Sequence, residues 1–261
     1  MSRRLLLLQA SAALAVVTIS CAPRLANLPK GPGAAFPDYT SAYAQATEGC
    51  RDVRTMRGVL AISGRAAGNR FRASIDAGFE SPAKVRLELP APGKPLFIFV
   101  ASGNQATLLL PRDGRVLRNA PPAATLEALA GIALGPDDLR SIVAGCGFGA
   151  GQASAGRAFE RGWASVDVGD SVNYLQQLDG RWRLVAASND GIEVRYADFA
   201  AGMPMTVRVR MPGPHPTDLT VRLSQVDTNE PLDPEVFQVD IPSNAVPMTL
   251  DELRQAGPLG R

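Results

Sequence analysis

The chain has 261 residues, of which 46% are hydrophobic and 20% are charged. This composition is typical of a globular domain and excludes a disordered chain. Arg3 and Arg4 stand in a leader-like stretch, and removing them from the 27 Lys and Arg residues leaves 25, equal to the 25 Asp and Glu residues. The balance gives no support for binding of nucleic acid through net charge.

Residues 1–20 have the composition of a secretory signal, because two arginines precede a long apolar stretch and small residues precede Cys21. The run Thr18-Ile19-Ser20-Cys21 resembles the lipobox of bacterial lipoproteins, with Thr18 in place of the usual Leu. The resemblance implies that the signal is removed and that Cys21, as the new first residue, carries acyl groups such as palmitate. An ordinary signal peptide with an incidental cysteine and a plain transmembrane anchor are the alternatives.

The residues after Cys21 bear on location and domain organisation. Ala22 stands where lipoproteins retained in the inner membrane carry Asp, so the resemblance implies the outer membrane, at its periplasmic face. Residues 21–37 are rich in Pro, Gly and small side chains and read as a lipidated tether. Residues 38–261 are long enough for one domain with a sizeable core.

Three segments of this domain have helical patterns. Apolar residues recur at helical spacing over 38–54, and we expect one face of this helix to lie on a sheet. A short helix is predicted over 125–130. Another is predicted over 136–144, where Pro136 opens the first turn and Gly145 follows the end.

Two further cysteines, Cys50 and Cys146, follow the leader. An exported protein can form disulfides, but the sequence leaves open whether these two are bridged or are separate buried thiols. The chain has no CxxC pair, and its single histidine, His215, lies between prolines. We therefore expect no metal site and no cofactor.

Short runs bounded by Gly, Pro, Asn and Asp predict about ten or eleven antiparallel strands. Asp179-Gly180 and Asp190-Gly191 are strong hairpin signals. The pattern indicates a mainly β (α+β) fold, with strands before and after the central helix pair.

Two strands in the stretch 86–118 do not alternate between apolar and polar residues. Leu96–Val100 and Leu108-Leu109-Leu110 place apolar side chains on both faces of the sheet, whereas an antiparallel sheet usually leaves one face to water. Either protein or a bound apolar ligand must cover them. The candidate cavity-lining residues, with core packing as the alternative for each, are Phe97, Phe99, Leu108, Leu110, Leu139 and Ile142.

The order of elements resembles the LolA/LolB-like class of periplasmic lipoprotein carriers. It runs from lipobox and tether through a helix, a strand meander, a helix pair and a second meander to Phe237 and Pro242 near the end. The resemblance implies a curved antiparallel half-barrel whose helices plug the concave face, with acyl chains held between helices and sheet. One departure is the loop 90–95, which has no large apolar residue where the lipoprotein-inserting member exposes a Leu.

A catalytic function finds no support. The chain has no GxSxG motif, and His215 has no evident partner. Asp137 and Asp138 are neighbours on a helix, so they face different ways and suit the helix dipole better than acid–base work. The glycine-rich run 145–151 follows a helix and lacks the Lys-Ser/Thr ending of a phosphate loop.

Two functions remain. The first is a monomeric, outer-membrane-anchored lipoprotein that binds an acyl chain or another hydrophobic segment in an apolar cavity, in lipid or lipoprotein trafficking. The alternative is a non-catalytic structural or assembly factor of the envelope with a packed core. A continuous apolar cavity would favour the first and a close-packed interior the second.

Overall fold

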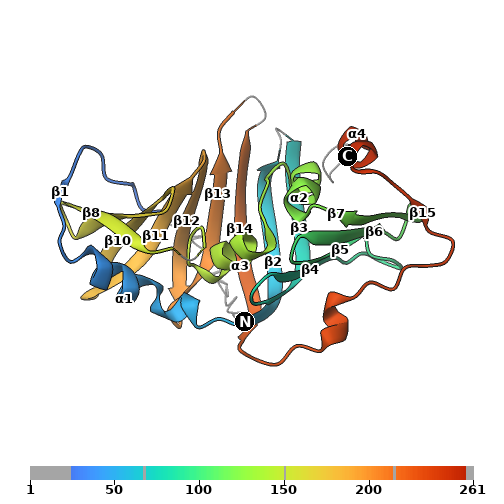
Figure 1. Ribbon diagram of the computed structural model, residues 1–261, viewed down its shortest axis with the longest axis horizontal. Helices are drawn as coiled ribbons and strands as arrows, with labels where there is room; N and C mark the ends of the chain where they lie inside the picture. The colour runs from blue at the N-terminus through green and yellow to red at the C-terminus, as the bar shows by residue number, and fades with distance from the viewer. Residues whose placement is uncertain (1–24, 67–68, 150, 214–215, 257–261) are drawn as a thin grey trace, which may run out of the picture.

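The computed structural model of the protein describes residues 25–66, 69–149, 151–213 and 216–256. These residues form one large open sheet of fifteen strands with four α-helices and one short 3-10 helix (Figure 1). The helices are α1 (Tyr39–Arg51), α2 (Pro122–Ala130), α3 (Pro136–Ala144), η1 (Pro234–Phe237) and α4 (Leu250–Ala256). The strands are β1 (Ala34–Ala35), β2 (Thr55–Ala66), β3 (Asn69–Glu80), β4 (Lys84–Leu89), β5 (Phe97–Ser102), β6 (Gln105–Leu110), β7 (Arg115–Ala120), β8 (Ala153–Phe159), β9 (Trp163–Val168), β10 (Ser171–Leu178), β11 (Arg181–Asn189), β12 (Ile192–Ala200), β13 (Met203–Met211), β14 (Thr217–Thr228) and β15 (Val246–Pro247).

The sheet consists of two meanders joined at their long central strands. One meander runs from β2 to β7 and the other from β8 to β14, and they join because β14 pairs with β2. Val221 lies opposite Ile62 in this pairing, and Leu219 lies opposite Gly64. All neighbouring strands are antiparallel except β15, which pairs in parallel with β7. The predicted mainly β, antiparallel fold is confirmed.

The number of strands differs from the prediction, since fifteen are present rather than ten or eleven. For example, β8 and β9 are separate strands because Arg161 and Gly162 between them both adopt positive φ angles, 59° and 71°. Two residues with positive φ make the tight turn that a hairpin needs. The two-residue strands β1 and β15 have no periodic pattern to reveal them.

Short strands from the two terminal segments pair with the edges of the sheet. β1 pairs with β8 at one edge, and β15 pairs with β7 at the other. An unpaired edge strand invites association with other chains, so this arrangement protects both edges. In Figure 1 the N-terminal segment approaches the left edge from behind the sheet, and the C-terminal segment passes round the right edge to α4.

The C-terminal segment also accounts for the apolar side chains on the second face of β5 and β6. Val100, Leu109 and Val116 are buried on the face away from the helices, which we call the outer face. The segment with η1 packs on β4 and β5, where Arg86 donates hydrogen bonds to the Val236 and Gln238 carbonyls at 3.2 and 2.9 Å. Protein therefore covers the outer face at β4 and β5.

The opposite face, which we call the inner face, carries the main core. α1 packs against β8 and β11, as predicted, through Ala42, Tyr43 and Cys50. α2 and α3 lie over the centre of the sheet, and α4 packs on α2 (Figure 1). None of the helices within the described residues is long and apolar enough to cross a membrane.

Candidate ligand cavity

An apolar cavity of about 120 Å³ lies between the α2–α3 pair and the centre of the sheet. Its floor comes from both meanders, because β13 and β14 meet β2 to β5 there. All its lining side chains are apolar: Leu60, Ile62, Phe71, Ile75, Leu87, Phe97, Leu126, Leu129, Ala130, Ile132, Leu134, Leu139, Ile142, Val143, Val207, Val209, Leu219 and Val221.

The roof of the cavity is formed by α2, α3 and the five-residue connection 131–135. Pro122 and Pro136 occupy first-turn positions, where a missing backbone N–H costs nothing. Gly131 ends α2 with φ at 72°, a left-handed conformation that favours glycine. The connection contributes Ile132 and Leu134 to the cavity, so its apolar side chains close the roof.

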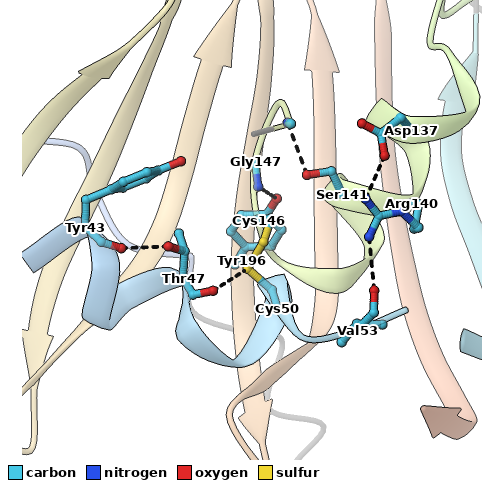
Figure 2. The surroundings of a disulfide bond; sticks show 11 residues. Tyr43, Thr47, Cys50, Val53, Asp137, Arg140, Ser141, Cys146, Gly147 and Tyr196 are labelled. Carbon is cyan, nitrogen blue, oxygen red and sulfur yellow. Dashed lines mark hydrogen bonds and ion pairs between the residues drawn. A yellow bond between two sulfur atoms is a disulfide. The ribbon is translucent and has the colours of Figure 1, made fainter. Parts of the chain in front are cut away.

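One end of the roof is fixed to α1. Cys146, just beyond α3, forms a disulfide with Cys50, with Cα atoms 5.6 Å apart (Figure 2). Arg140 on α3 donates to the Val53 carbonyl at 3.1 Å and pairs with Asp137 at 2.6 Å. The sequence left the bridge open, and the structure contains it.

A buried polar contact holds the chain after the disulfide against the sheet. The Gly147 N–H donates to the Tyr196 hydroxyl at 3.1 Å, and the Gly149 N–H donates to Ser141 Oγ at 3.1 Å. Burial raises the pKa of the Tyr196 hydroxyl, and the Gly147 hydrogen bond only partly offsets this. Tyr196 therefore stays neutral over the physiological range.

The cavity approaches solvent at three neighbouring strands. Ile62, Phe71 and Val221 line it and are only partly buried, whereas Leu60, Ile75 and Leu87 are buried. The partly exposed side chains lie toward the β2–β3 hairpin end of the sheet. On the floor, the cavity therefore lies nearest to solvent at this end of the sheet.

The predicted lining residues divide into two groups. Phe97, Leu139 and Ile142 line the cavity. Phe99, Leu108 and Leu110 are buried in the main core but are not among its lining residues. Cys21 and His215 lie outside the described residues.

The sequence analysis did not predict most of the residues that form the cavity floor. Ile62, Val209 and Leu219 line the floor, but no pattern in the sequence showed that β2, β13 and β14 lie side by side. The end of the loop 90–95 also differs from the prediction. Leu96 was predicted to start a strand, but it precedes β5 and is 39% exposed. The loop therefore ends beside an exposed apolar side chain that the sequence analysis did not expect.

The polar groups around the cavity form structural contacts. Asp137 is engaged by Arg140, and within the described ranges no group of three or more His, Cys, Asp or Glu residues could hold a metal ion. Burial raises the pKa of Asp138, and the neighbouring Asp137 charge raises it further. The lining of the cavity contains no nucleophile or base, so what it can do is hold an apolar group.

The chain matches no known family model, and no curated protein matches it in sequence. The solved structures that share its architecture include the following two. A LolA superfamily protein from Nitrosomonas europaea covers 77% of this chain and 97% of its own, with a TM-score of 0.54 at 11% identity. A DUF1329 family protein from Desulfovibrio piger covers 78% of this chain and 98% of its own, with a TM-score of 0.51 at 9% identity. The LolA-like fold that the sequence resembles is thereby confirmed.

Proposed function

We propose that this protein is an envelope lipoprotein that binds an acyl chain non-covalently in its cavity. We further propose that Cys21 anchors it at the periplasmic face of the outer membrane. The observation that carries the proposal is the wholly apolar lining between helices and sheet. Each methylene that moves from water into such a site contributes about 0.8 kcal/mol. No catalytic step is part of this function.

The cavity is small for a ligand site, so we propose that the structure represents a closed conformation. At about 120 Å³ it is smaller than the roughly 300–1,000 Å³ typical of ligand sites. It accepts a short apolar segment as it stands, and a full acyl chain requires the roof to move away from the sheet. The disulfide fixes the Cys146 end, so the connection 131–135 is the part that moves.

Two features support the proposed compartment. The Cys50–Cys146 disulfide suits an oxidising, extracytoplasmic location. The lipobox-like residues before Cys21 support attachment to a membrane through lipid. Outer-membrane placement is supported by Ala22 in the sequence.

A second candidate function is a structural or assembly factor of the envelope. The small cavity favours it, and large core side chains such as Phe79, Phe99 and Leu108 are fully excluded from solvent, as in a packed core. This protein would act through its surface and would need no ligand.

Ligand binding separates the two candidates. Protein purified from membranes is examined by native mass spectrometry, and delipidated protein is titrated with a fluorescent fatty acid. Ala130→Phe places a large side chain in the cavity and is expected to weaken binding at least tenfold. Ala124→Phe, on the same helix and away from the cavity lining, is the matched control and keeps the affinity. Equal affinity in both variants, or no binding by the wild type, rules out the carrier function.

A further inference from the structure

Seven arginines gather on the outer face at the centre of the sheet. Strand pairing aligns their positions in three rows that cross β12, β13, β14, β2 and β3. One row runs Glu193, Arg210, Asp218, Arg65, Arg70; the next runs Arg195, Arg208, Thr220, Ser63, Arg72; and the third contains Thr206, Arg222, Ala61 and Ser74. We call these rows the arginine face.

The two carboxylates of the arginine face are already engaged. Asp218 pairs with Arg208 at 2.6 Å and with Arg210 at 3.8 Å. Glu193 pairs with Arg195 at 2.8 Å and with Arg210 at 3.8 Å. Both acidic side chains of the face therefore pair with arginines on β12 and β13.

Four arginines of the face remain exposed and without an ion pair in the part of the chain that the structure describes. They lie on β14, β2 and β3: Arg65, Arg70, Arg72 and Arg222. The mature chain is balanced overall, with 25 basic and 25 acidic residues once Arg3 and Arg4 are removed from the 27. On three adjacent strands, these four arginines therefore form a local cluster of positive charge.

The N-terminal segment joins the same face. Arg195 donates a hydrogen bond to the Ala26 carbonyl at 3.2 Å, which holds the tether against the outer face of β12. Cys21 is five residues before Ala26, and five extended residues span at most about 18 Å. Arg195 and Arg72 lie four strand spacings apart in one row, or roughly 19 Å. An anchor at Cys21 thus keeps Arg195 close to the membrane and allows the rest of the arginine face to turn toward it.

We propose that the arginine face docks on the phosphate headgroups of an anionic membrane surface, so that the protein lies with its outer face toward the bilayer and its helices away from it. The proposal rests on the lipid anchor of the proposed function, but not on acyl binding. A planar guanidinium presents paired donors to phosphate oxygens, which suits arginine to this contact. One acyl chain alone binds a membrane weakly, and a basic patch supplies a second attachment.

Vesicle flotation tests the proposal with the mature chain, residues 21–261, carrying Cys21→Ser, so that the result depends on neither the anchor nor the cavity. The probes are vesicles of phosphatidylcholine with and without phosphatidylglycerol. Each basic side chain near an anionic surface contributes about fivefold in affinity. Replacing Arg65, Arg70, Arg72 and Arg222 by Gln is therefore expected to weaken binding to the anionic vesicles more than tenfold.

The matched control removes the same number of charges elsewhere. It replaces the exposed cations Arg54, Lys94, Arg118 and Arg161 by Gln, all of which lie outside the three rows. Binding that falls in the first variant alone, and that weakens with added salt, supports the docking. The docking is overturned by equal losses in the two variants, by equal binding to both vesicle types, or by no vesicle binding of the wild type. In the last case the arginines would face solvent or an acidic protein partner instead.

Discussion

Cys50, in the last turn of α1, is bonded to Cys146, two residues beyond the end of α3, across a sequence separation of 96 residues. The bond joins the helix that covers the second meander to the helix pair that roofs the cavity. Because the separation spans the whole first meander, the bridge closes a loop that contains β2 to β7.

Loss of this disulfide is expected to destabilise the protein strongly. In the chain-entropy model a loop of this length contributes about 4–5 kcal/mol. Urea unfolding of the wild type with and without reductant measures the difference. A Cys50→Ser, Cys146→Ser double variant should match the reduced wild type and should not respond to reductant. Unchanged stability on reduction would show that the bridge does not constrain the fold in solution.

Phe97 and Phe99 provide a paired test of the cavity, because both point to the inner face of β5 but only Phe97 lines the void. Truncation of either side chain to Ala is expected to cost about 3–5 kcal/mol. Phe97→Ala enlarges the existing cavity, and an enlarged apolar cavity takes up small apolar molecules such as benzene. Benzene should therefore raise the melting temperature of Phe97→Ala clearly more than that of Phe99→Ala. Equal responses would place the void elsewhere.

Local patterns predicted part of the roof of the cavity, since Pro136 and Gly145 mark the observed ends of α3. Of the floor, they predicted only Phe97 among the lining residues. The cavity itself depends on the pairing of β14 with β2, a contact between strands about 160 residues apart that no local pattern encodes. The covered outer face was likewise recognised as a requirement from Leu109, but its cover, the segment around η1, has no regular apolar period.

Cys21 lies outside the described residues, so its lipidation is tested in cells. Cys21→Ser is expected to abolish incorporation of a labelled palmitate analogue and to release the protein from the membrane fraction. Thr18→Leu, which restores the usual lipobox residue, should keep the label. Label that persists in Cys21→Ser would contradict attachment at this residue.

Arg86 fastens the C-terminal segment to the outer face through the Val236 and Gln238 carbonyls. A hydrogen bond to a charged group contributes about 1.5–3 kcal/mol, and the same side chain pairs with Glu88 at 2.6 Å, so Arg86→Gln should lower the free energy of unfolding by at least that amount. Arg57→Gln is the control, because the Arg57 side chain is 61% exposed and pairs only with Asp227 at the surface. Such a pair contributes about 0–1 kcal/mol. Equal effects of the two substitutions would mean that the segment is not held by Arg86.

Tyr196 is expected to make stability fall at alkaline pH. Burial raises the pKa of its hydroxyl above that of the unfolded chain, about 10. A raised pKa in the folded state favours the protonated form, so this stabilisation is complete below pH 10 and is lost as the pH rises further.

Tyr196→Phe removes the titrating group, and it also leaves the Gly147 N–H without its acceptor at a cost of about 1–3 kcal/mol. Urea unfolding between pH 7 and pH 11 should therefore show a less stable variant at neutral pH with a shallower alkaline loss. Tyr174→Phe, at a partly exposed site, serves as the control. An alkaline loss of the same size in Tyr196→Phe and wild type would assign it to other groups.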